Sequence, residues 1–338
     1  MPVTDALGRV MRYLRVSVTD QCNLRCDYCR PAGASQRSGR GHPLTLEEMA
    51  RLCRLFVALG IDRIRLTGGE PLLRRNLVWL VREVSALSGL TDLSLTTNGV
   101  LLARHADDLC RAGLQRVNIS LDTLDPALYA RITRGGELSR VLSGIDAAVR
   151  VGLKPVKINM VVMRGINDHE IPEMIAFAER YGLVPRLIEI MPVGSVGLAG
   201  SVGRCGEERH LSADEMVARA RLGDGREWMP VAHPGAKGAG PARYFRIAGS
   251  AMEVGLIAAR SRHFCDSCNR MRLTAHGVLV SCLGERERVD LKTPLRDGAT
   301  DQTLMDWIRT GVSRKPRGHH FEQGAAGASG WEMSGLGG

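Results

Sequence analysis

The chain has 338 residues, of which 44% are hydrophobic, and its formal net charge is +10. This length exceeds one ordinary domain, and the hydrophobic content is enough for a sizeable core. No apolar run is long enough for a membrane span, and the N-terminus lacks a charged-then-apolar signal region. We therefore expect a soluble, cytoplasmic protein that does not act at a membrane.

The charge and the cysteine content limit the partners and the compartment. Nine cysteines, an odd number, without an export signal indicate a reducing compartment and metal ligation rather than disulfides. The excess of basic residues favours an anionic partner, which could be nucleic acid, a phosphorylated small molecule or an acidic protein. A merely basic surface would give the same net charge, so charge alone does not choose among them.

Strands and helices are expected to alternate along the first part of the chain. The expected strands are 13–18, 63–67, 92–97, 116–122, 155–162 and 185–191. Helices are expected at 45–59, 75–88, 102–112, 139–151 and 170–181. This alternation predicts a parallel sheet, and right-handed crossovers would curl it into a barrel or a doubly wound sheet.

Polar side chains recur at every second position of these strands. They are Arg15, Ser17, Thr19, Arg63, Arg65, Thr67, Ser94, Thr96, Asn118, Ser120, Asp122, Lys157 and Asn159. Parallel strands covered on both faces are usually apolar throughout, and a face open to solvent is unusual for a parallel sheet. We therefore predict an α/β fold, an incomplete, laterally open barrel of six strand–helix units whose lumen holds a polar ligand.

The last third of the chain changes in composition. Residues 193–209 are rich in Gly, Ser and Val and are expected to form a flexible connection, and 223–241 are rich in Gly and Pro. A helix is expected near 213–221, strands near 242–248 and 251–257, and a helix near 301–310. We predict a core barrel of residues 1–222 and a C-terminal α+β domain of residues 223–338.

The first cysteine cluster, Cys22, Cys26 and Cys29, follows the first expected strand with the spacing C-x3-C-x2-C. Three thiolates cannot pair among themselves without leaving one over, but they can converge on one soft metal centre. A [4Fe–4S] cluster held by three cysteines has one iron without a protein ligand, which can bind a small molecule. A zinc knuckle with its fourth ligand elsewhere, or three unrelated buried thiols, are the alternatives.

A second cluster, Cys265, Cys268 and Cys282, again offers three thiolates. A zinc ribbon is the main alternative to an iron–sulfur centre here, because C-x2-C followed by a later cysteine is commonly a zinc site. Its fourth ligand would be His263 or His276. We expect the remaining cysteines Cys53 and Cys110 to be buried on helices, and Cys205 receives no role.

Two further patterns bear on ligand binding. Gly68-Gly69-Glu70-Pro71 directly follows the second expected strand, where glycines allow close approach of the backbone. Arg270 and Arg272 alternate on an expected strand, and arginine pairs suit a phosphate or a purine edge. No G-x4-G-K-[ST] sequence is present, which excludes a P-loop nucleotide site.

The run from Arg15 to Cys29, the second triad, the Gly-Gly-Glu-Pro stretch and the terminal glycines together resemble one group of radical S-adenosylmethionine (SAM) enzymes, the GTP 3′,8-cyclases of molybdenum-cofactor biosynthesis. The resemblance covers nearly the whole chain and implies two [4Fe–4S] clusters, one on each triad. It implies SAM contacts by Tyr28, Gly68, Gly69, Glu70, Ser120 and Met191. It implies GTP contacts by Arg15, Arg65, Thr96, Lys157, Arg270 and Arg272, and a tail, Gly337 and Gly338, that enters the active site.

The resemblance also implies a reaction. The first cluster would reduce and split SAM, and the resulting radical would take a hydrogen from C3′ of GTP. Attack on C8 would then give 3′,8-cyclo-7,8-dihydro-GTP, while the second cluster orients the purine. The implied partners are GTP, an external electron donor and the downstream cyclic pyranopterin monophosphate synthase; nucleic acid is not expected, and a homodimer is left open.

Two alternatives to this function remain at this stage. Another two-cluster radical SAM enzyme, such as a peptide-modifying maturase, would normally carry more cysteines in its C-terminal domain. A zinc-binding nucleic-acid module would fit the positive charge, but basic residues are scattered and aromatic stacking platforms are sparse.

Overall fold

The computed structural model describes residues 2–30, 41–192, 208–231, 240–284, 288–319, 321 and 335. Its strands are β1 (Tyr13–Ser17), β2 (Arg63–Thr67), β3 (Asp92–Thr97), β4 (Arg116–Ser120), β5 (Val156–Val162), β6 (Val184–Glu189), β7 (Trp228–Pro230), β8 (Arg243–Ile247), β9 (Glu253–Ile257), β10 (Arg270–Leu273), β11 (Val278–Val280) and β12 (Val289–Asp290). Within the described residues they form one sheet, ordered β12-β11-β10-β1-β2-β3-β4-β5-β6-β9-β8-β7.

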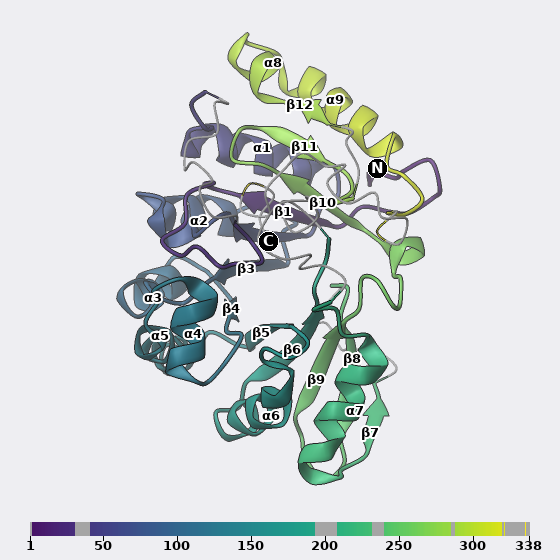
Figure 1. Ribbon diagram of the computed structural model, residues 1–338. Coiled ribbons are helices and arrows are strands. Elements are labelled where there is room, and N and C mark those ends of the chain that lie inside the picture. Colours follow the sequence, from purple (N-terminus) through teal and green to yellow (C-terminus); the bar gives the residue numbers. More distant parts are fainter. Residues whose placement is uncertain are drawn as a thin grey trace.

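The centre of this sheet is the predicted barrel. Strands β1 to β6 pair in chain order and all in parallel, each within two residues of its expected bounds. The sheet curves with its helices on the outer side (Figure 1). Its two edge strands in the described residues are β7 and β12, so the barrel stays open. The predicted six-unit open α/β barrel is confirmed.

The helices that cover the barrel also follow the expected order. They are α1 (Leu46–Ala58), α2 (Leu77–Ser85), α3 (Leu102–Arg111), α5 (Leu138–Arg150) and α6 (Ile171–Arg180), with short 3-10 turns η1 (Pro71–Leu73) and η2 (Asp168–Glu170). The helices α4 (Pro126–Thr133) and α8 (Lys292–Arg296) were not expected. The Asp125 carboxylate accepts hydrogen bonds from the N–H groups of Ala127 and Leu128, and Pro126 occupies the first turn. The Asp-Pro pair could therefore have predicted the start of α4 from the sequence.

The C-terminal elements extend the barrel at both edges (Figure 1). At one edge β9 pairs in parallel with β6, and α7 (Ala213–Asp224), β7 and β8 lie near it. At the other edge β10 pairs in parallel with β1, followed by β11, β12, α8 (Lys292–Arg296) and α9 (Asp301–Ser313). The stretch expected to be a boundary contains β7, which pairs with β8. The division at residue 222 stays a prediction, and the strands of the second unit complete the sheet of the first.

The two faces of the parallel strands carry different side chains. Apolar residues such as Leu14, Ile64 and Ile119 are fully buried in the hydrophobic core. Polar residues at alternating positions are buried as well, which an open sheet face would not allow. Because burying a polar group without a partner is costly, they bond to one another: Arg65 Nε donates to Ser94 Oγ at 3.2 Å. The predicted polar lumen is confirmed.

No helix among the described residues is long and apolar enough to cross a membrane.

Candidate active site

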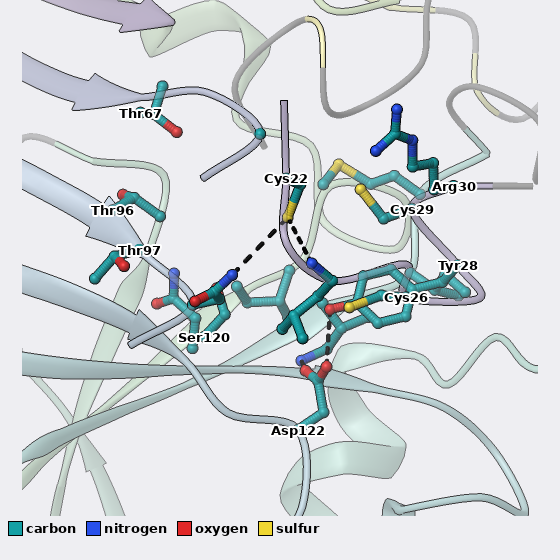
Figure 2. Close-up of a pocket in the computed structure, with 18 of the residues that line it drawn as sticks. Cys22, Cys26, Tyr28, Cys29, Arg30, Thr67, Thr96, Thr97, Ser120 and Asp122 are labelled. Carbon is teal, nitrogen blue, oxygen red and sulfur yellow. Dashed lines mark hydrogen bonds between the residues drawn. The ribbon is translucent and has the colours of Figure 1, made fainter. Parts of the chain in front are cut away.

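The first cysteine triad lies at the carboxyl ends of the barrel strands. Cys22, Cys26 and Cys29 line a cavity of about 190 Å³ (Figure 2). The same cavity is lined by the last residues of four strands, which are Thr67, Thr97, Ser120 and Glu189. This is the edge at which α/β folds of this kind place their ligands, because the loops that follow parallel strands converge there.

The loop that carries the first triad is fixed by its neighbours in space. Its Asp27 N–H donates to the carbonyl oxygen of Ile132 at 3.1 Å, at the end of α4. The hydroxyl of Tyr28 donates to Asp122 Oδ2 at 2.8 Å (Figure 2), and the other oxygen of Asp122 accepts from the Val161 N–H at 2.9 Å. The triad is therefore held by α4 and by the strands β4 and β5.

The Gly68-Gly69-Glu70 turn packs against the start of this loop. A side chain at Gly69 would collide with the carbonyl oxygen of Gln21, and the Gly69 N–H donates to the carbonyl oxygen of Thr19 at 2.8 Å. Gly68 and Gly69 both line the first cavity. The glycines are thus needed for close approach to the neighbouring backbone, whatever ligand also binds there.

The Glu70 side chain points into the protein. It is fully buried, and its carboxylate accepts hydrogen bonds from Thr97 Oγ1 at 2.7 Å and from the N–H groups of Asn98 at 2.7 Å and Leu72 at 3.0 Å. Asn98 Nδ2 in turn donates to Cys22 Sγ at 3.8 Å (Figure 2). Glu70 therefore orients Asn98 toward the first triad and is not among the residues that line the cavity.

Burial dominates the electrostatics of the first triad. It raises the pKa of Cys22, and it raises the pKa of Cys26 well above the ordinary value, with Cys29 and Asp122 adding to the effect. Burial also raises the pKa of Asp122 to about 6 and that of Glu70 to about 7, against the hydrogen bonds that favour their charged forms. Thiols in this setting keep their protons unless a metal centre replaces them.

The second triad lies at the edge of the barrel next to β1. Cys265 begins the 3-10 turn η4 (Cys265–Ser267), Cys268 directly follows that turn, and Cys282 lies after β11. All three line a second cavity, of about 140 Å³. Parallel pairing of β10 with β1 places the triad there, because it sets Arg272 beside Arg15. This contact joins residues about 250 positions apart in the sequence.

The second cavity is strongly basic. Its charged lining residues are Arg15, Arg65, Arg186, Arg270, Arg272 and Lys315, and none of its described lining residues carries a carboxylate. Burial lowers the pKa of Arg272 to about 10, with repulsion from Arg270 adding to it, and lowers that of Arg65 to about 10. Mutual repulsion of this kind is relieved by a bound anion.

These cations also act on the second triad. Burial by itself would raise the pKa of Cys268, but the charges of Arg270 and Lys315 outweigh burial and lower it to about 7. The pKa of Cys282 is raised by burial. The two cavities share the lining residues Asn159, Ile188 and Met191, so they adjoin.

Comparison with known proteins identifies the family. Residues 16–178 match the Radical SAM superfamily and residues 184–321 match Molybdenum Cofactor Synthesis C. The GTP 3′,8-cyclase of Hydrogenovibrio crunogenus is 42% identical over 339 residues, covering 100% of both chains. That of Heliobacterium modesticaldum is 45% identical and covers 94% of each chain. The chain belongs to the GTP 3′,8-cyclase family.

Solved structures support the fold at greater distance from this family. The crystal structure of Streptococcus suis SuiB bound to precursor peptide SuiA matches with a TM-score of 0.61 at 15% sequence identity. The match covers 93% of this chain and 73% of SuiB. At this identity the likeness concerns the fold alone. The resemblance stated from the motifs is confirmed, and it favours a cyclase over a maturase or a nucleic-acid module.

In neither triad do the three sulfurs gather as closely as the ligands of a single zinc ion. Among the described residues, the group of three ligands gathered within 4.8 Å is His263, Cys265 and His319, and neither triad is gathered so closely. Three sulfurs spread around a shared cavity suit a centre wider than one ion. His276, the other candidate zinc ligand, instead contacts Asp20 Oδ2 at 3.2 Å. The residues of both triads thus fit the clusters that the family implies.

Most of the predicted site residues of this cyclase family member meet in the two cavities. Tyr28, Gly68, Gly69, Ser120, Met191 and Thr96 line the first cavity, and Arg15, Arg65, Arg270 and Arg272 line the second. Lys157 is among the lining residues of neither; its ammonium donates to the Tyr244 hydroxyl at 2.8 Å, and burial lowers its pKa to about 6. Gly337 and Gly338 lie outside the described residues. The contacts of all these residues with SAM or GTP stay predictions.

Cys53 and Cys110, which belong to neither triad, are not among the lining residues of either cavity. Cys53 is fully buried in α1, as expected. Cys110 lies on α3 and is only partly buried, and its thiol donates to the carbonyl oxygen of Val151 at 3.3 Å. Cys205 lies outside the described residues.

Several cavity residues received no role from the sequence. Asp122 was noted only as part of a polar strand face, and Asn98, Arg186 and Lys315 were not singled out. Arg186 could have been predicted, because it lies two residues before Ile188 on the same face of β6, the spacing that lumen residues have on the other strands. Lys315 carried no local signal, because its partners lie on β10 and after β11.

Proposed function

We propose that this chain converts GTP into 3′,8-cyclo-7,8-dihydro-GTP, the first step of molybdenum-cofactor biosynthesis. The observation that carries the proposal is a pair of adjoining cavities, each with three cysteines, of which one is lined by six cations and no described carboxylate. A metal centre beside a site for a polyanion fits a radical enzyme that acts on a nucleoside triphosphate. Full-length relatives carry the name of this activity.

In this proposal the first triad holds a [4Fe–4S] cluster whose open iron position binds SAM. When bound, the cluster and SAM supply the one-electron chemistry that removes the hydrogen at C3′ of GTP. The chain's part is to hold the cofactor: Gly68, Gly69, Ser120 and Met191 line its cavity, and Tyr28 is fixed by Asp122. Glu70 supports the site through Asn98 and the 68–70 turn.

The second cavity holds GTP. Arg15, Arg65, Arg270 and Arg272 bind the triphosphate, which relieves the repulsion among these buried guanidinium groups. Thr96 lines the first cavity and Lys157 donates to the Tyr244 hydroxyl, and in this proposal both also contact the substrate. The buried lumen excludes water, which protects reactive species from side reactions.

The second triad holds another [4Fe–4S] cluster that orients the purine through its open position. Gly337 and Gly338 are proposed to enter the active site, since residues without side chains fit a crowded cavity. An external one-electron donor is required, because the product step consumes electrons. We propose the cyclic pyranopterin monophosphate synthase as the enzyme that takes the product, action in the cytoplasm, and a homodimer as the assembly to be tested.

One anaerobic assay tests the proposed function. The reconstituted protein is incubated with SAM and a reductant, with and without GTP, and the nucleosides and nucleotides are analysed by mass spectrometry. We expect 5′-deoxyadenosine to rise with GTP and a cyclised nucleotide isobaric with GTP to appear. Formation of 5′-deoxyadenosine regardless of GTP, with no such nucleotide, would reject GTP as the substrate.

A further inference from the structure

An N-terminal loop reaches the second triad from outside the barrel. Asp5 and Arg9 close a tight turn: Arg9 Nε donates to Asp5 Oδ2 at 2.6 Å, and the backbone N–H of Arg9 donates to Asp5 Oδ1 at 2.9 Å. The side chain of Arg9 is only 8% exposed, and that of Asp5 is 0% exposed. A buried guanidinium group held this way has a fixed orientation, because the group is planar and its Nε edge is already hydrogen-bonded to the Asp5 carboxylate.

The free side of this guanidinium contacts the second triad. Arg9 Nη1 donates to the carbonyl oxygen of Cys265 at 2.8 Å and to that of Arg317 at 2.9 Å, and Nη2 donates to that of Pro316 at 2.6 Å. One side chain therefore joins three segments that are far apart in sequence: the N-terminal loop, the turn η4 that begins at Cys265, and the segment 315–317 after α9.

The segment 315–317 is tied to the same triad at a second point. Lys315 Nζ donates to the carbonyl oxygen of Arg270 at 2.9 Å and to that of Ser281, the residue before Cys282. The chain then passes Cys265 closely, because a side chain at Gly318 would touch Cys265 Sγ at 3.4 Å. Arg9 and Lys315 thus bracket the triad from both sides of this segment.

From this geometry we infer that Arg9, oriented by Asp5, is a positioning residue for the second triad. Its fork fixes the carbonyl of Cys265 against the segment 315–317, so that the Cys265 thiolate faces Cys268 and Cys282 across the second cavity. The inference rests on the proposed role of the second triad. It assigns a role in the substrate site to a loop that touches neither cavity.

The test compares Arg9→Gln with Arg12→Gln in the reconstituted holoenzyme. Arg12 is a matched control, because its side chain pairs with Asp62 on the surface at 2.9 Å and is 53% exposed. The readout is alkylation of each cysteine by iodoacetamide, followed by mass spectrometry. We expect Cys265 to be labelled on the order of tenfold faster in Arg9→Gln, since local opening exposes it, with Cys22, Cys26 and Cys29 protected as in the parent protein.

Turnover gives a second readout on the same samples. Arg9→Gln should still form 5′-deoxyadenosine but lose most of the cyclised nucleotide, whereas a misfolded variant would lose both and expose the first triad. Arg9→Lys keeps the positive charge but loses the planar guanidinium group that donates to several acceptors, so it should behave like Arg9→Gln. Unchanged Cys265 labelling in Arg9→Gln, equal labelling in Arg12→Gln, or full rescue by Arg9→Lys would overturn the inference.

The two proposals fail in distinguishable ways. If the parent protein makes no cyclised nucleotide, the proposed function fails, while the labelling of Cys265 still decides the role of Arg9. If the parent cyclises GTP and Arg9→Gln does so at the same rate with Cys265 protected, only the role of Arg9 is lost.

Discussion

The two cysteine triads each have three thiols, but the charged side chains that line their cavities differ. Around the first, burial raises the pKa values of Cys22 and Cys26, and for Cys26 the neighbouring Cys29 and the carboxylate of Asp122 add to the effect. Around the second, Arg270 and Lys315 lower the pKa of Cys268 to about 7 despite burial. The first setting suits a cationic ligand such as the sulfonium of SAM, and the second suits a polyanion such as a triphosphate. We therefore propose that each triad holds a cluster and that the charges around it favour a different ligand.

The largest expected difference comes from removing a ligand of either triad. Cys22→Ala, Cys26→Ala or Cys29→Ala should abolish SAM cleavage and therefore every product. Cys265→Ala should damage the second cluster and abolish cyclisation while 5′-deoxyadenosine still forms, because the first site stays intact. Iron content and product analysis by mass spectrometry measure both effects. SAM cleavage by Cys22→Ala, or full iron content and turnover of Cys265→Ala, would contradict the division of roles.

A smaller effect is expected from the basic lining of the second cavity. Arg272→Gln removes one charge-assisted contact to the triphosphate, worth on the order of a 10- to 100-fold rise in KM for GTP. SAM cleavage in the absence of GTP should not change. Arg111→Gln is the control, because that side chain is 68% exposed on α3. Equal KM values for Arg272→Gln and the parent protein would remove Arg272 from the GTP site.

The first cavity should respond to Asp122 in a different way. In the parent protein, one carboxylate oxygen of Asp122 accepts from the Tyr28 hydroxyl and the other accepts from the Val161 N–H. Asp122→Asn replaces one of these oxygens by an NH₂ group, which donates, so one of the two hydrogen bonds that hold the loop of the first triad is lost. We expect a roughly tenfold weaker affinity for SAM and an unchanged KM for GTP. Titration of the variant with SAM measures the first, and steady-state kinetics measure the second. An altered KM for GTP together with normal affinity for SAM would contradict the assignment of Asp122 to the SAM site.

The smallest effect concerns Glu189, at the end of β6. Burial would raise its pKa, but hydrogen bonds from His210, Ser261 and the N–H of Arg260 outweigh burial and lower it to about 2. A depressed carboxyl pKa contributes stability that is present above pH 4.5 and is lost as the pH falls toward 2. Glu189→Gln should therefore lose less stability than the parent protein between pH 4.5 and pH 2, as followed by circular dichroism. Parallel acid-unfolding curves would contradict this.

The sequence predicted the barrel well because its signals are local. Alternation of polar and apolar residues placed β1 to β6, and the capping box at Thr45 placed the start of α1. The cysteine spacing and the resemblance placed both triads. The helix α4 was not predicted although Asp125-Pro126 marks its start, because a helix of only 8 residues is too short to show a clear helical periodicity.

Other features could not be predicted from the sequence, because they depend on contacts between distant segments. Pairing of β10 with β1 and of β9 with β6 joins the C-terminal third to both edges of the barrel. The Glu70 carboxylate accepts hydrogen bonds from Thr97 and Asn98, which no local pattern marks, and its contact with SAM stays a prediction. Lys315 and Arg9 reach the second triad from the two ends of the chain, and no local pattern marks such a contact.

In the proposed mechanism, substrate in the second cavity must reach the reactive centre of the first. GTP carrying deuterium at C3′, incubated anaerobically with the reconstituted protein, SAM and a reductant, tests this. We expect the deuterium to appear in 5′-deoxyadenosine, as measured by mass spectrometry. Unlabelled 5′-deoxyadenosine formed together with the cyclised nucleotide would show that the hydrogen comes from elsewhere, and it would contradict the account.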